Sequence, residues 1–202
     1  MKKLIMLFFI MNVLSLVPAT EYNLYRNVRQ NILPEISVEE FEELSLEDQY
    51  TSYISSFASV GDTRNQQLTY ARLMVEKYGR EVLSYIDKDL KTVTFYNMYK
   101  KPYDDRIGLI ADILSNLNKG KLLTDEEVNE YIEIYEKKLE EYVKKFKIID
   151  GTVYSAVRCI VFIGQSDAPI YLQGDEEDLK NYYEQKLGIT DIVVGSFDNR
   201  WE

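Results

Sequence analysis

Carboxylates are the most abundant side chains in this sequence that could carry out acid-base chemistry. The chain has 34 Asp and Glu residues, no histidine and one cysteine, Cys159. Without histidine, a Ser-His-Asp triad, a Cys-His pair, an HExxH helix and every His-bearing zinc site are excluded. Two carboxylates suffice for glycoside cleavage, so a carboxylate-dependent hydrolase of cell-wall glycan is the enzyme class that stays open. No pattern selects two of these acids, and we name no catalytic residue.

A metal or cofactor site is not indicated either. The acidic run from Asp175 to Asp178 lacks the D-x-D-x-D-G spacing of a calcium loop, and acids at a helix start already complement the helix dipole. With one cysteine there is no intramolecular disulfide and no cysteine cluster. Cys159 lies in the apolar run from Val157 to Phe162, which predicts a buried core thiol. We therefore assign no metal and no cofactor.

One segment departs from the acidic background and could form a binding surface. Phe95 to Tyr103 reads FYNMYKKPY and is expected to connect two helices. Tyrosine is common at protein contacts because it is large, fairly rigid and amphipathic. An alternative is that these aromatic rings fold back over the ends of the adjacent helices. The candidate residues for contact with an acidic partner are Tyr96, Tyr99, Lys100, Lys101 and Tyr103.

Helix signals recur through the first half of the sequence. Capping signals at Ser37 and Ser45 predict two short helices, the second with an apolar face up to a break at Gly61. Gly79 is expected to join two antiparallel helices in a tight hairpin. A further helix follows Asp104 and Asp105. The apolar positions of the two hairpin helices run from Leu68 to Tyr78 and from Val82 to Leu90, and those of the helix after Asp105 run from Ile107 to Leu117.

The second half is also predicted to be helical. Thr124 and Glu127 form a capping box that opens the longest helix, with a heptad-like apolar seam, acids over 125–136 and lysines over 137–147. The apolar run 152–163 suits a strand or a helix, and a helix capped by Asp150 and buried at the centre is favoured. A last helix ends at Gly188, and the tail 189–202 is expected to be a short strand or an extended strap.

The alternation of short helices and tight turns over residues 63–118 resembles the HEAT-type α-helical repeats. The resemblance rests on apolar spacing and on the turn at Tyr78 and Gly79. It implies a curved stack of helix pairs used for contact with proteins. No fixed repeat period accompanies it.

The N-terminus predicts export. Lys2 and Lys3 precede an apolar run from Leu4 to Val17, and Val17-Pro18-Ala19 suits signal peptidase, so 1–19 reads as a cleavable signal peptide. The run is shorter than the roughly 20 residues of a spanning helix. Cleavage leaves 22 basic and 34 acidic residues, a net charge of −12. This negative charge disfavours nucleic acid as a partner. Because cleavage removes the apolar run, we expect no transmembrane segment in the mature protein.

Taken together, the residues predict an all-α fold of stacked antiparallel helix pairs, either an α-α superhelix or an irregular bundle, with at most one short C-terminal strand. Residues 20–202 are expected to form a single domain, with an arm at 20–36 and a tail at 189–202. The expected location is the periplasm or the exterior. The expected role is non-catalytic binding of a protein partner whose identity, like the oligomeric state, the sequence does not specify.

Overall fold

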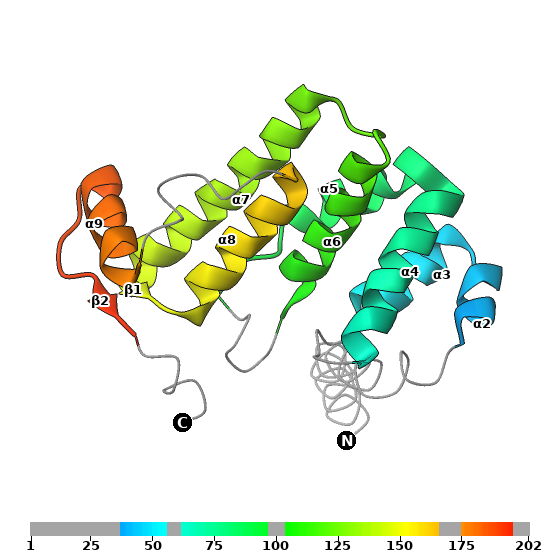
Figure 1. Ribbon diagram of the computed structural model, residues 1–202, viewed down its shortest axis with the longest axis horizontal. Coiled ribbons are helices and arrows are strands. Elements are labelled where there is room, and N and C mark those ends of the chain that lie inside the picture. The colour runs from blue at the N-terminus through cyan, green and yellow to red at the C-terminus, as the bar shows by residue number, and fades with distance from the viewer. Residues whose placement is uncertain (1–36, 56–61, 97–103, 166–174, 196–202) are drawn as a thin grey trace, which may run out of the picture.

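The computed structural model describes residues 37–55, 62–96, 104–165 and 175–195 (Figure 1). The predicted signal segment, the arm at 20–36 and the break at Gly61 lie outside these described residues. The described part of the chain is mainly α-helical, as predicted, with a parallel sheet of two short strands.

The two N-terminal helices are short and are both capped by serine. Helix α2 (Val38–Glu43) starts at the capping box of Ser37, and α3 (Leu46–Ile54) starts at Ser45, whose side chain accepts from the Asp48 backbone N–H. The buried Phe41 ring stacks on Tyr70 of α4 with 4.2 Å between centroids. This stack packs α2 onto the rest of the molecule. The caps at Ser37 and Ser45 confirm both predicted start sites.

The predicted hairpin at Gly79 is not formed. Helix α4 (Asp62–Tyr78) is followed by the 3-10 turn η1 (Gly79–Val82) and by α5 (Leu83–Leu90). Gly79 has φ of +54°, as its role after a helix requires, but α4 packs on α6 and α3 rather than along α5. One reason is that Arg80 fixes the turn to the start of α7. It donates to the Leu122 carbonyl at 2.6 Å and pairs with Glu127 at 2.6 Å. Hydrogen bonding to Arg80 lowers the pKa of Glu127 to about 2.

Helix α8 (Gly151–Gly164) lies at the centre of the fold, packed against α6 (Arg106–Lys119) on one side and α7 (Asp125–Phe146) on the other. This confirms the helical interpretation of the apolar run 152–163. Asp150 caps the helix, accepting from the backbone N–H of Thr152 at 2.8 Å. A helix that is apolar on most sides suits this position because both flanks are buried.

The C-terminal part ends in the predicted strand. Helix α9 (Glu176–Leu187) is capped by Asp175 and terminated by Gly188 with φ of +62°. Strand β2 (Val193–Val194) then pairs in parallel with β1 (Ile148–Ile149), with Ile148 opposite Val193. The sequence indicated β2 but not its partner, since two residues between two helices give no strand pattern of their own.

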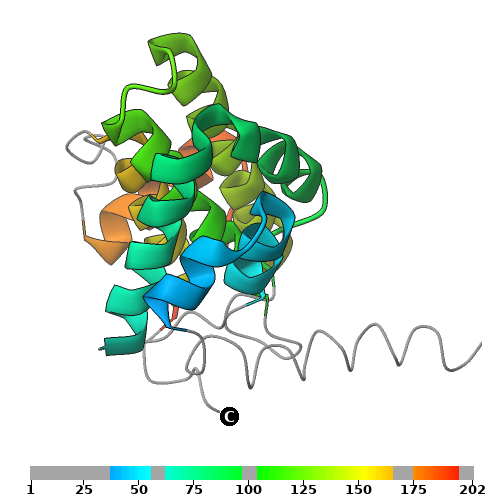
Figure 2. The ribbon, with the colours of Figure 1, turned by 90° about the vertical axis from the view of Figure 1, so that its right-hand side faces the viewer.

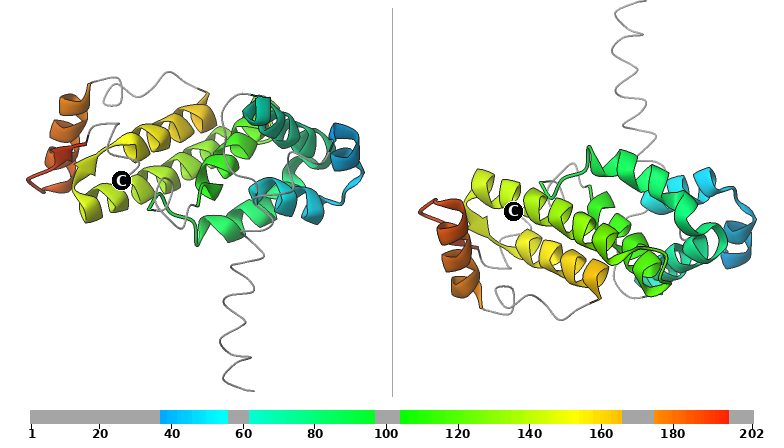
Figure 3. Two further views of the ribbon diagram at one scale, coloured as in Figure 1. Left: turned by 90° about the horizontal axis from the view of Figure 1, so that it is seen from below. Right: turned by 90° about the horizontal axis from the view of Figure 1, so that it is seen from above.

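The packed helices form a row in the order α4, α6, α8, α7 and α9. Figures 1 and 3 place α9 at one end and α2 at the other, and Figure 2 shows α2 and α3 on the α4 end. Helix α5 lies behind the row, tied to α7 by the hydroxyl of Tyr131, which donates to Asp87 at 2.8 Å. Within the described ranges, no helix combines the length and the hydropathy needed to span a bilayer.

Tyrosine fills much of the core. Several rings are fully or almost fully buried, and their hydroxyls hydrogen bond to carboxylates or carbonyls on other elements. Burying a ring together with a satisfied hydroxyl adds apolar area and a directional contact at once. The tyrosines that are buried and hydrogen bonded in this way are Tyr50, Tyr53, Tyr135 and Tyr142.

Candidate functional site

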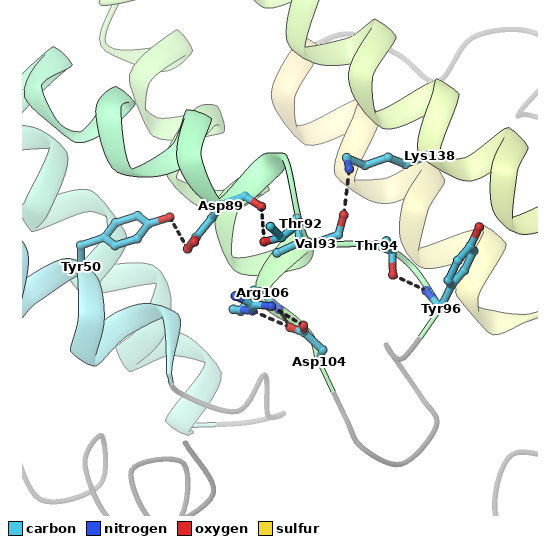
Figure 4. Close-up of polar contacts among 9 residues, drawn as sticks. All are labelled: Tyr50, Asp89, Thr92, Val93, Thr94, Tyr96, Asp104, Arg106 and Lys138. Carbon is cyan, nitrogen blue, oxygen red and sulfur yellow. Dashed lines mark hydrogen bonds and ion pairs between the residues drawn. The ribbon is translucent and has the colours of Figure 1, made fainter. Parts of the chain in front are cut away.

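The described part of the tyrosine- and lysine-rich segment ends at Tyr96, a few residues after α5 and its turn (Figure 4). Of the five candidate contact residues, Tyr96 is described and is half-buried. The other four, Tyr99, Lys100, Lys101 and Tyr103, lie outside the described residues. The geometry of the candidate site is therefore that of Tyr96 and of the residues that fix the chain on both sides of 97–103.

The chain before the segment is fixed in the core. Val93 and Phe95 are buried, and the Phe95 ring meets the Tyr135 ring edge to face at 6.0 Å. The ammonium of Lys138 on α7 donates to the Val93 carbonyl at 2.8 Å, as Figure 4 shows. Burial lowers the pKa of Lys138, so this contact places a partly desolvated cation against the chain. Phe95 thus follows the alternative interpretation, in which segment aromatics cover the adjacent helices.

The chain after the segment is fixed by an arginine. Arg106 opens α6 and binds Asp104 through two parallel bonds, Nε to Oδ1 at 2.9 Å and Nη2 to Oδ2 at 2.6 Å. Oδ1 of Asp104 also accepts from the backbone N–H of Arg106 at 3.2 Å, so Asp104 serves the helix start. Asp105, at the N-cap position, makes no side-chain cap bond. A bidentate pair is rigid, so it holds this end of the segment firmly.

Between these fixed ends, Tyr96 packs on the C-terminal end of α7. Its ring meets Phe146 edge to face at 5.5 Å and lies 6.2 Å from the ring of Tyr142. The ammonium of the exposed Lys145 lies 4.2 Å from the Tyr96 centroid, a cation-π distance. We call Tyr96, Lys145 and Phe146 the Tyr96 cluster. It presents an aromatic ring and a cation together at the surface.

The chain that leads to Tyr96 comes from α5, and α5 is fixed to α3. The Tyr50 hydroxyl on α3 donates to Asp89 at 3.0 Å, and Thr92 donates to the Asp89 carbonyl at 3.1 Å (Figure 4). Burial raises the pKa of Tyr50, with the negative charge of Asp89 adding to the effect. The turn after α5 is therefore set by contacts to α3, and it directs the chain toward Tyr96.

One of the two buried carboxylates in the described part of the chain, Asp112, belongs to an ion pair elsewhere. Asp112 accepts from both terminal nitrogens of Arg64, at 2.6 and 2.8 Å, and from the Tyr53 hydroxyl at 3.1 Å. Its side chain is 2% exposed and that of Arg64 is 28% exposed. These bonds join α3, α4 and α6, so Asp112 is engaged in structure rather than free for acid-base catalysis.

Cys159 belongs to the core, as predicted. It is buried and unbridged, and burial raises the pKa of its thiol to about 12, with the negative charge of Asp112 adding to the effect. A thiol of this kind stays protonated at neutral pH and is a poor nucleophile. Across the described ranges, no three Asp, Glu or Cys residues are grouped to hold a metal ion.

The sequence did not predict that α7 contributes Lys145 and Phe146 to the candidate site. Lys145 and Phe146 already had local explanations, a lysine in the last helical turn and the end of the apolar seam. Glu140, in the same half of α7, binds Lys186 of α9 at 2.9 Å. The available signal was compositional. The lysine-rich half of α7 and the aromatic segment both depart from the acidic background of the sequence.

In comparisons with known proteins, the chain matches no family model, no curated protein and no solved structure. Its fold and candidate site thus define it as a mainly α-helical protein with an aromatic and cationic surface cluster at the end of its longest described helix.

Proposed function

We propose that this chain is an exported, non-catalytic protein-binding module, and that the Tyr96 cluster is part of its contact surface. The observation that carries the proposal is a half-buried tyrosine held under a lysine at the surface, with the chain fixed on both sides of 97–103. A prearranged aromatic anchor binds at a lower entropic cost than a freely moving one. The predicted signal segment supports export to the periplasm or the exterior.

The test is capture of a partner from the periplasmic or extracellular fraction. The bait is the wild-type protein, a Tyr96→Ser variant or a triple variant in which Tyr96, Tyr99 and Tyr103 are serine. The expected result is a partner retained by wild type and lost by the variants, with unchanged thermal unfolding. Loss of folding in the single variant would instead show that Tyr96 serves the core.

Tyr182→Ser is the matched control. Tyr182 is also half-buried and lies under a lysine, with Lys186 5.4 Å from its centroid, but it belongs to α9. Capture should survive this change. The hydrolase alternative has its own readout: turnover of peptidoglycan by the purified protein, abolished by one Glu→Gln change, would replace the binding function with an enzymatic one.

A further inference from the structure

The two halves of α7 carry opposite charge, and the basic half ends at the Tyr96 cluster. Residues 125–136 include six acids and no base, whereas residues 137–147 include five lysines and two glutamates. One of these glutamates, Glu140, is neutralised by Lys186. A chain with a net charge of −10 thus places local positive charge around the half-buried ring of Tyr96.

The helix dipole accounts for only part of this charge. Lysines in the last turn, Lys144 and Lys145, are favourable next to the exposed carbonyls, but this benefit fades within one turn. Lys137 lies more than two turns upstream and is exposed, and Lys147 follows the helix and is also exposed. Of the five lysines, Lys138 is engaged with the Val93 carbonyl. Three exposed lysines, Lys144, Lys145 and Lys147, remain at this end of α7, and Lys137 adds a fourth further up the helix.

We infer that this surface, Tyr96 and Phe146 with Lys137, Lys144, Lys145 and Lys147, binds an acidic segment of the partner protein. The inference rests on the proposed function and specifies its partner. Carboxylates of the segment pair with the lysines, and an apolar side chain packs on the Tyr96 ring. The overall negative charge of the chain repels an acidic partner, but at 0.1 M salt charges more than about 10 Å away are largely screened. The lysines at this end of α7 can therefore attract an acidic segment locally.

Charge-matched peptides test the inference directly. A fluorescein-labelled peptide of Glu, Asp and Gly with one Tyr is titrated with the purified protein and followed by fluorescence anisotropy. The matched peptide carries Gln and Asn in place of the acids. The acidic peptide is expected to bind at least about tenfold more tightly, because only it pairs with the lysines.

Charge reversal on the protein locates the site. Lys144→Glu combined with Lys145→Glu is expected to weaken binding of the acidic peptide at least about tenfold, since like charges then face each other. Lys119→Glu is the matched control, because Lys119 is an exposed lysine in the last turn of α6, and that turn lies beside the start of α7 rather than its end (Figure 1). It should change binding less than about twofold. Equal binding of both peptides, or equal effects of both charge reversals, would overturn the inference.

Two further outcomes separate this inference from the proposed function. If a captured partner is lost on Tyr96→Ser but unaffected by the double charge reversal, protein binding stands and the acidic partner is wrong. If phosphatidylglycerol vesicles bind through these lysines while the acidic peptide does not, the surface recognises anionic lipid and the inference fails.

Discussion

Tyr53 and Tyr96 show two opposite uses of the same side chain. Tyr53 is fully buried, and its hydroxyl donates to the Leu109 carbonyl at 3.3 Å and to Asp112 at 3.1 Å. Tyr96 is half-buried, and its ring, rather than its hydroxyl, makes the contacts, with Phe146 and Lys145. The first arrangement fixes three helices, and the second leaves an aromatic face at the surface. Stability should therefore depend on Tyr53 and its partners, and binding on Tyr96.

Alkaline pH should separate the interior from the surface with the largest effect. Burial raises the pKa values of Tyr53, Tyr135 and Cys159 above those of the unfolded chain. The folded state therefore holds these protons more tightly, so stability is complete below the unfolded pKa values, near 8.5 to 10, and is lost as pH rises above them. Each group contributes about 1.4 kcal/mol per pH unit, so the three together lose about 4 kcal/mol per unit above pH 10.

Urea unfolding followed by circular dichroism between pH 6 and pH 11 measures this loss. Between pH 6 and pH 8 the unfolding free energy should change little, since the chain has no histidine. Tyr53→Phe should reduce the alkaline slope, because one of the buried groups with a raised pKa is removed. A slope that is the same in this variant would show that Tyr53 does not resist ionisation.

Removing Asp112 should be the most damaging single substitution in the comparison. Asp112→Ala removes both acceptor oxygens that the Arg64 guanidinium binds, and it leaves the Tyr53 hydroxyl with the Leu109 carbonyl alone. Breaking a buried pair costs about 3 to 5 kcal/mol, and the partial exposure of Arg64 favours the lower figure. Chemical denaturation gives the value.

Glu76→Ala is the control, because Glu76 pairs with Arg72 at the surface, where such pairs contribute about 0 to 1 kcal/mol. Equal losses in both variants would mean that the interior pair is not structural.

Deleting one hydroxyl at a time compares the two tyrosines directly. Tyr53→Phe should cost about 2 kcal/mol, because Asp112 loses a hydrogen bond to a charged acceptor. Tyr96→Phe should stay within about 0.5 kcal/mol, since the ring contacts are kept and, within the described part of the chain, its hydroxyl has no hydrogen-bond partner. Urea midpoints of the two variants measure the difference. If the order were reversed, Tyr96 would belong to the structural core.

The sequence predicted those features that local spacing encodes. The caps at Ser37, Ser45, Thr124 and Asp150 each act on backbone two or three residues away, so residue type and position suffice to find them. The tyrosine-carboxylate bonds join residues 39, 44 and 59 positions apart, and no local pattern encodes such pairs. No local pattern encodes the pairing of β1 with β2 either. The predicted hairpin at Gly79 does not form because α4 packs on α6 and Arg80 binds the Leu122 carbonyl.

For the candidate site, the sequence identified Tyr96 but not what lies beside it. An aromatic and basic segment between two helices is visible in composition alone. That Lys145 and Phe146 would join it depends on the direction in which the chain leaves α5, and this direction is set by Tyr50, Asp89 and Lys138 in three different elements. Tertiary contacts of this kind determine surfaces, whereas local patterns determine helices.

The smallest expected effect tests whether Tyr96 and Lys145 act together. Lys145→Ala, Tyr96→Leu and the double variant form a thermodynamic cycle, in which a cation-π contact at an exposed site gives a coupling of about 0.5 to 1 kcal/mol. The coupling should persist when Lys145 is replaced by Arg, which keeps the charge over the ring, and vanish with Met, which keeps only the length of the chain. Unfolding free energies measured at low and moderate salt supply the numbers. A coupling retained by Met would mean that the ring holds Lys145 by packing alone, and the cation would then be free to pair with a partner at no cost to the fold.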